Sequence, residues 1–156
     1  MQNALDIAKY VIHQHWVNGE FITNLKLQKV LYYVQGYVSK RCNEPAYPQR
    51  IYNWPYGPVV PDVYYEYNQN RANPIGEPEN SALEQAEKRL KRDPAMFHVV
   101  NQVIRKSYDY TASQLVGMTH EEAPWKNSKE YEEISYAQIA KYFRDHDPLK
   151  LSKEVG

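Results

Sequence analysis

The segment Asn24–Lys40, "NLKLQKVLYYVQGYVSK", carries the pattern that decides the fold. Its main apolar stripe recurs at helical spacing and consists of Leu27, Val30, Leu31, Val34 and Val38. Leu25, Tyr32 and Gly36 fall on the opposite side of the same helix, near Lys29. A helix that is apolar on two sides either lies at the centre of a bundle or has a second partner. Buried bundle helices are the commoner cause, so the segment predicts a central helix, and Gly36 would let another backbone approach it closely.

Helix signals continue on both sides of this segment. A first amphipathic helix is expected to end near Gly19, and Thr23 is suited to cap the next one. Later helix starts are expected at Pro61, at Ser81 (a charged, exposed helix to Arg92), after Asp93, and at two capping boxes, Thr111 with Gln114 and Ser135 with Gln138. Arg50 to Trp54 could add a short edge strand. The sequence therefore predicts one mainly α domain over residues 1–147, a bundle of about six or seven helices, with a short loose tail over 148–156.

Two proline-rich corners interrupt the helices. The first is "NWPYGPVVPDVY", Asn53 to Tyr64, where prolines fix φ and remove backbone donors. We expect Trp54 and Tyr56 to be mostly buried there, Gly57 to lie close to neighbouring backbone, and Pro61 to sit in the first turn of a helix.

The second corner is "MTHEEAPWKNS", Met118 to Ser128. Its histidine, His120, could form a hydrogen bond across the domain. Pro124 would fix the chain so that Trp125 packs inward. In both corners a proline sets the path of the chain and a large ring anchors it.

Charge and cysteine content exclude several classes of protein. Lys plus Arg equals Asp plus Glu, at 19 each, so no basic field favours DNA or RNA as a partner. Cys42 is the only cysteine, which excludes an internal disulfide framework and fits a reducing, cytoplasmic location. The apolar runs are far too short to span a membrane.

No catalytic, cofactor-binding or metal-binding motif is found. His120, Glu121 and Glu122 do not form HExxH, because the second histidine is missing. Adjacent carboxylates such as Glu121 and Glu122 are expected to be solvated, and Cys42 lacks an activating environment. We expect no cofactor and no metal, and an uncharacterised hydrolase or metal enzyme is the low-ranking alternative.

Tyrosine is over-represented, with fifteen in the chain and nine of them between Tyr32 and Tyr67. Tyrosine suits both the edge of a core and a contact surface, because it has a large apolar body and a polar tip. Tyrosine side chains are usually at least partly buried in folded proteins, which favours the interpretation that these tyrosines form the edge of the core. A contact surface for another macromolecule is the alternative.

Three segments together resemble a known family: "ITNLKLQKVLYYVQGY", "NWPYGPVVPDVYYEY" and "THEEAPW". In this order, across roughly Leu5 to Phe143, they are similar to the Panacea antitoxin domain, whose family includes SocA-like antitoxins and phage-associated GepA-like proteins. The motif positions are Leu27, Gln28, Lys29, Tyr33, Trp54, Tyr56, Gly57, Pro58, Val59, Pro61, Tyr64, Thr119, His120, Pro124 and Trp125.

The resemblance implies a binding role and no enzymatic activity. It implies an antitoxin that neutralises a cognate protein toxin, encoded by an adjacent gene in a bacterial or prophage genome, by direct contact. The alternative is an adaptor that delivers the toxin to a AAA+ protease. Because interface hot spots favour aromatic and basic residues, we hypothesise that Lys29, Tyr32 and Tyr65 face the toxin while Tyr64 belongs to the core. Alternatively these tyrosines are structural, and the toxin binds elsewhere, for example on the charged helix from Ser81 to Arg92.

Overall fold

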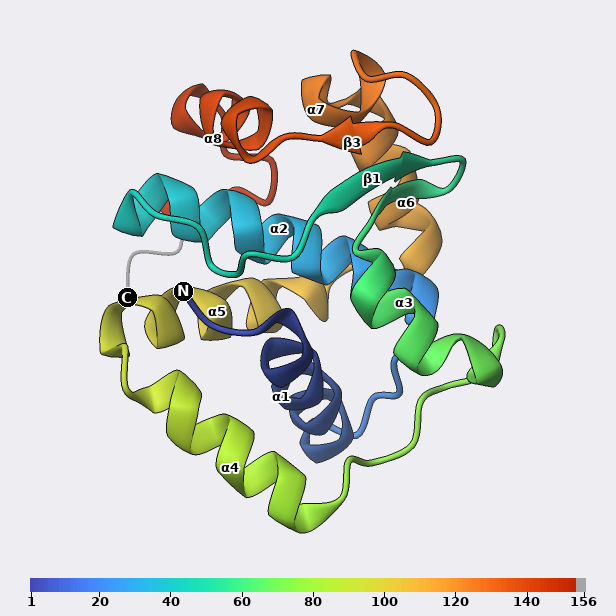
Figure 1. The fold of residues 1–156 in the computed structure, drawn as a ribbon, viewed down its shortest axis with the longest axis vertical. Coiled ribbons are helices and arrows are strands. Elements are labelled where there is room, and N and C mark those ends of the chain that lie inside the picture. Colours follow the sequence, from blue (N-terminus) through green and yellow to red (C-terminus); the bar gives the residue numbers. More distant parts are fainter. Residues whose placement is uncertain (154–156) are drawn as a thin grey trace.

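The computed structural model describes residues 1–153 (Figure 1), and these residues are mainly α-helical, as predicted. The helices are α1 (Ala4–Val17), α2 (Asn24–Cys42), α3 (Pro61–Tyr67), α4 (Asn80–Lys91), α5 (Pro94–Ser107), α6 (Ala112–Glu121), α7 (Ala123–Lys126) and α8 (Tyr136–Asp145). Two short 3-10 helices, η1 (Asn68–Asn70) and η2 (Leu151–Lys153), and three strands, β1 (Ile51–Trp54), β2 (Gly57–Val59) and β3 (Glu133–Ile134), complete the fold. The described part of the chain thus has eight α-helices, slightly more than expected, since "APWK" forms the one-turn helix α7.

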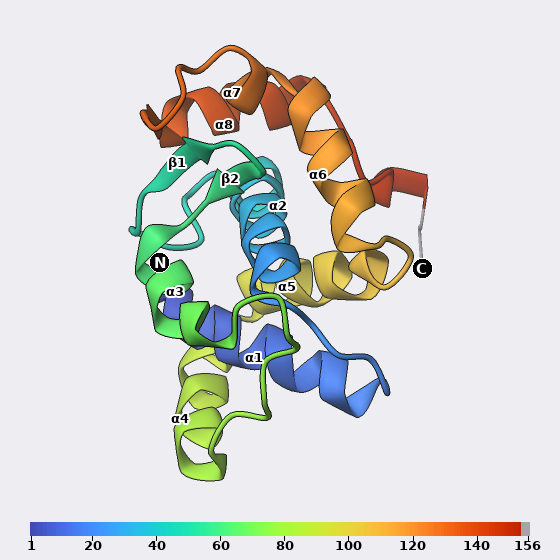
Figure 2. The ribbon, with the colours of Figure 1, turned by 90° about the vertical axis from the view of Figure 1, so that its right-hand side faces the viewer.

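Helix α2 is the central element, as its two-sided pattern predicted. It packs against α1, α5, α6, α8 and β2, and Figures 1 and 2 show it running through the middle of the molecule. Every apolar residue of α2 from Leu27 to Val38 is buried. The expectation that Gly36 admits a neighbouring backbone is wrong. A Cβ at Gly36 would lie 2.4 Å from atoms of the Phe143 ring, so the close neighbour is an aromatic side chain of α8.

The helix starts follow the capping signals. The Thr23 and Asp93 side chains each accept a hydrogen bond from a backbone N–H in the first turn of α2 and α5, respectively. Both capping boxes form as predicted, at the starts of α6 and α8. Pro61 occupies the first turn of α3, where its missing N–H costs no hydrogen bond. The local signals therefore fixed where most helices begin.

A small antiparallel sheet joins the two corners, with strand order β2–β1–β3. The expected edge strand, β1, is therefore the central strand, because the two residues of β3 pair along its free side. The Asn53 side-chain amide donates to the carbonyl oxygens of Trp125 (2.8 Å) and Ser128 (3.1 Å). The Trp125 indole N–H in turn donates to the carbonyl oxygen of Trp54 at 2.8 Å. These bonds hold the first corner against the second.

The expectation of a loose tail after Asp147 is wrong for residues 148–153. Leu149 and Leu151 are buried in the hydrophobic core. Tyr37 of α2 donates its hydroxyl hydrogen to the Asp147 carboxylate and accepts a hydrogen bond from the backbone N–H of Leu149. Residues 154–156 of the expected tail lie outside the described residues. Within 1–153, no helix combines the length and apolar character needed to cross a membrane.

Candidate functional site

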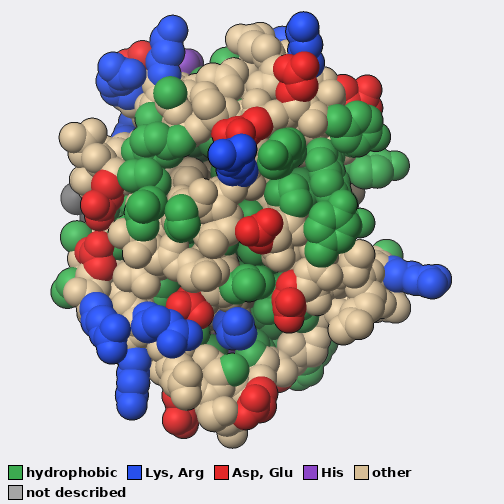
Figure 3. All heavy atoms as spheres, viewed as in Figure 1, with side chains coloured by type: hydrophobic (Ala, Val, Ile, Leu, Met, Phe, Trp, Pro, Cys, Tyr) green, Lys and Arg blue, Asp and Glu red, His purple; other side chains and the backbone are tan. Residues whose placement is uncertain are grey.

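An open groove of about 710 Å³ lies between the start of α2, the β1–β2 turn, α3 and the segment after η1. We call it the aromatic groove, because five rings line it: Trp54, Tyr56, Tyr64, Tyr65 and Tyr131. Figure 3 shows hydrophobic side chains gathered on the right-hand side of that view, over the β1–β2 hairpin and α3. A mostly apolar concavity of this size with a few polar groups is the usual form of a binding site.

The rings of the groove differ in exposure. Tyr56, Tyr65 and Tyr131 are 70%, 61% and 63% exposed, whereas Trp54 and Tyr64 are half-buried. The centroids of Trp54 and Tyr64 are 5.0 Å apart and those of Tyr64 and Tyr65 are 5.5 Å apart, both edge to face. Edge-to-face pairs at this spacing are attractive, so the half-buried rings support the exposed one.

These exposures correct part of the first-corner prediction. Tyr56 was expected to be mostly buried, but it lies in the turn between β1 and β2, where Trp54 pairs with Gly57, and its side chain remains exposed to solvent. Trp54 and Tyr64, expected in the core, only reach its edge because the groove opens over them. Tyr65 is exposed, as expected.

Buried amides form the floor of the groove. The Gln28 side chain accepts a hydrogen bond from the backbone N–H of Val60 (2.9 Å) and donates one to the Asn24 side-chain oxygen (2.9 Å). Asn24 then donates to the carbonyl oxygen of Tyr64 at 3.0 Å. This chain of bonds ties α3 to α2, so the floor is fixed before any partner arrives.

Two residues on the rim of the groove have backbone conformations that residues other than glycine rarely adopt. Arg71 has φ 53° and ψ −126°, and Tyr131 has φ 65°. Hydrogen bonds from their N–H groups to the carbonyl oxygens of Asn68 (3.0 Å) and Asn53 (2.6 Å) hold them there. Such conformations cost about 1–3 kcal/mol each and are concentrated at functional sites.

Lys29, predicted to face a partner, is fully buried. Its ammonium donates to the carbonyl oxygen of Pro58 at 3.0 Å, and burial lowers its pKa to about 7. A Cβ at Gly57 would lie 2.5 Å from Lys29 Cε and 2.8 Å from Thr119 Oγ1, so side chains approach Gly57 and not the backbone that we expected. The surface position proposed for Lys29 is wrong, because β2 covers this side of α2.

Tyr32 is also buried, contrary to the prediction, and it joins a hydrogen-bonded cluster with Tyr33 and Glu122. The Tyr32 and Tyr33 hydroxyls donate to the two oxygens of the Glu122 carboxylate, at 2.9 and 2.7 Å. We call these three residues the Tyr–Glu–Tyr cluster. The expectation that Glu122 is solvated is wrong: it is 4% exposed, because the extended residue between α6 and α7 faces α2. Burial raises its pKa to about 7, although the two hydroxyls partly offset this effect.

The second corner places its rings as a stack. His120 and Trp125 lie parallel, with centroids 4.0 Å apart, and Pro124 is buried beside them. The hydrogen bond expected from His120 is not found, since within residues 1–153 its buried Nε2 has no partner. Trp125 is half-buried, and its indole N–H reaches the first corner as described above.

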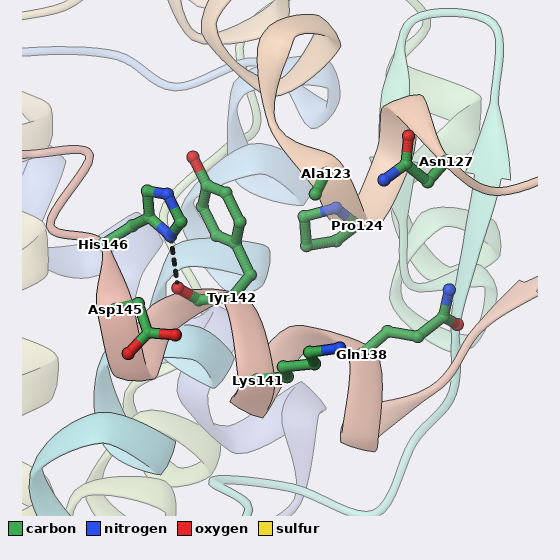
Figure 4. A pocket seen from close by; sticks show the side chains of 8 residues that line it. All are labelled: Ala123, Pro124, Asn127, Gln138, Lys141, Tyr142, Asp145 and His146. Atoms are coloured by element: carbon green, nitrogen blue, oxygen red, sulfur yellow. Dashed lines mark hydrogen bonds between the residues drawn. The ribbon is translucent and has the colours of Figure 1, made fainter.

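A second, smaller pocket of about 310 Å³ lies between α7 and α8 (Figure 4). At one end His146 stacks on Tyr142, with centroids 4.1 Å apart, and its Nδ1 is 2.8 Å from the Tyr142 carbonyl oxygen. Asn127 and Gln138 lie at the other end. Across the described residues, no three His, Cys, Asp or Glu side chains are placed to hold a metal ion. The residues that line the pocket include no Ser, Thr or Cys.

Comparison with known proteins adds one finding. A family model described as "Antitoxin SocA-like, Panacea domain" matches residues 27–126, more than half of the chain. The matched range holds most of α2, the first corner and the second corner up to residue 126, so the resemblance drawn from the three motif segments is confirmed. No curated protein and no solved structure matches the chain.

Proposed function

The chain belongs to the SocA-like antitoxin family with a Panacea domain, and from this premise we propose that it is the antitoxin of a bacterial or prophage toxin–antitoxin pair. In this proposal it binds a cognate protein toxin, encoded by an adjacent gene, in the cytoplasm and blocks the toxin by direct contact. The match over residues 27–126 is the observation that carries the proposal.

The geometry is compatible with a binding role. The rings of Tyr56, Tyr65 and Tyr131 are exposed around one groove, and exposed aromatics of this kind are enriched where proteins bind one another. The buried titratable groups Lys29 and Glu122 already have hydrogen-bond partners inside the domain. A structural role therefore explains why these two groups are buried, and no catalytic role is needed.

Co-expression with the product of the adjacent open reading frame tests the function. We expect the candidate toxin alone to stop growth, and co-expression of this chain to restore growth and to retain the tagged toxin on purification. Failure of the chain to restore growth would refute the antitoxin role.

The same experiment separates direct binding from delivery to a protease. In a host that lacks its AAA+ proteases, direct neutralisation predicts unchanged rescue and an unchanged toxin level. Rescue that disappears in this host, together with a rise in toxin level, would instead identify an adaptor.

A further inference from the structure

We infer that the aromatic groove receives the toxin, and that its occupant is a toxin segment with an apolar or aromatic side chain next to a carboxylate. This inference rests on the proposed function and adds the surface and the chemistry of the contact. It replaces the surface expected from the sequence, of which only Tyr65 is exposed.

The apolar part of the occupant follows from the rings. Tyr65 on α3, Tyr56 in the β1–β2 turn and Trp54 on β1 all line the groove, and the ring centroids of Trp54 and Tyr65 are 6.2 Å apart. A large apolar side chain inserted there would contact several ring faces and displace water from them. Rings already held in edge-to-face contact lose little conformational freedom on binding, and this preorganisation favours affinity.

The carboxylate follows from the charge of the lining. Arg71 is the only charged residue among those that line the groove, and its guanidinium makes no ion pair or hydrogen bond with any of residues 1–153. A partner carboxylate can accept two parallel hydrogen bonds from a guanidinium, whereas a partner Lys or Arg would be repelled. The charge of the groove therefore selects an acidic segment.

Other exposed apolar residues fit a docking role less well. Trp16 and Phe21 form an edge-to-face pair with centroids 4.9 Å apart at the end of α1. The Trp16 indole N–H already donates to the carbonyl oxygen of Ile75 at 3.1 Å, which is an internal anchoring contact. Phe21, 57% exposed, therefore serves as a matched control for an exposed ring outside the groove.

The test measures the affinity of the full-length chain for its purified toxin. We expect Tyr65→Ala to weaken binding by about 30-fold, the loss typical of an interface hot spot, and Phe21→Ala to leave binding unchanged. Tyr56→Ala, in the turn, provides a second groove variant. Thermal melting of each variant shows that it is folded before binding is interpreted.

The charge is tested by the dependence of affinity on salt. We expect the affinity of the wild-type chain to fall between about 50 mM and about 500 mM salt, and Arg71→Glu to bind at least tenfold more weakly at the lower concentration. Arg144→Glu, an exposed arginine in the last turn of α8 and outside both candidate surfaces, is the matched control. Equal losses for both arginine variants would show a non-specific charge effect and would overturn the carboxylate assignment.

The outcomes separate this inference from the proposed function. Suppose that the wild-type chain binds and neutralises the toxin, and that the folded Tyr65→Ala and Tyr56→Ala variants bind it as tightly as the wild-type chain. The groove is then refuted as the toxin-binding site, and the antitoxin role remains. If the wild-type chain neither binds nor neutralises the toxin, both proposals are refuted together.

Discussion

Replacement of Glu122 by Gln should change how the free energy of unfolding depends on pH. Glu122 has a pKa of about 7 in the folded protein and an ordinary value of 4.5 when exposed, because burial disfavours its ionised form. Between these two values the folded state binds more protons than the unfolded state. Glu122 therefore stabilises the fold fully at low pH, and this contribution is lost as pH rises through 7.

The size of the effect follows from the two pKa values. From about pH 5 to about pH 7.5, linkage predicts that Glu122 removes about 2 kcal/mol from the free energy of unfolding. Glu122→Gln stays neutral, and its side-chain oxygen can still accept a hydrogen bond from one of the two tyrosines, so this contribution disappears from its pH profile. The titratable groups that interact with Glu122 are Tyr32, Tyr33, Tyr37, Tyr142 and His146.

Urea denaturation of both proteins across this range measures the difference. His15 has its pKa lowered to about 4 by burial and acts in the opposite direction, so the wild-type profile alone is not decisive. Subtracting the Glu122→Gln profile from the wild-type profile removes the contributions of His15 and of all other groups that the two proteins share. We expect the difference between the two profiles to change by about 2 kcal/mol. Parallel profiles would refute the reasoning, because Glu122 would then titrate normally in the folded state.

Further predictions concern close contacts at glycines and are checked by urea denaturation. Gly57→Ala should lower the free energy of unfolding by about 3 kcal/mol, because φ is +111° and the new methyl group overlaps Lys29. Gly117→Ala is its control and should stabilise the protein by up to about 1 kcal/mol, since it lies in a helix with open space beside it. Gly36→Ala should cost about 2 kcal/mol by overlap with Phe143, and Phe143→Leu in the same chain should recover part of that loss; additive effects would contradict direct contact.

Local signals predicted the fold well because they act within a few residues. Thr23, Asp93 and the two capping boxes begin their helices through bonds to residues three positions away. The central place of α2 followed from its two-sided apolar pattern. The pairing of β3 with β1 was missed, since it involves two residues about eighty positions away with no turn signal linking them. The helical frame was therefore readable from the sequence, whereas the sheet order was not.

The candidate site was predicted only in part, because burial of polar side chains depends on distant partners. The position of Tyr32 off the main stripe of α2 suggested exposure, but α6 and α8 cover that side as well. The hydroxyls of two adjacent tyrosines on a buried helix require hydrogen-bond acceptors. This requirement was the one sequence signal that a carboxylate such as Glu122 is buried beside them. For Lys29 we find no comparable signal, since its single acceptor is a backbone carbonyl. Tyr65 was placed correctly because adjacent residues on a short surface helix diverge.

The packing of α2 also has a consequence for biosynthesis. Tyr37 and Asp147 are hydrogen-bonded although 110 positions separate them, and Phe143 closes over Gly36 from the same late part of the chain. At roughly 5–20 residues per second, a ribosome needs about 5–20 seconds to make this intervening stretch. During that interval the side of α2 that α8 covers in the finished fold stays exposed on the nascent chain. The emerging protein is thus an expected client for chaperones until its last helix is released.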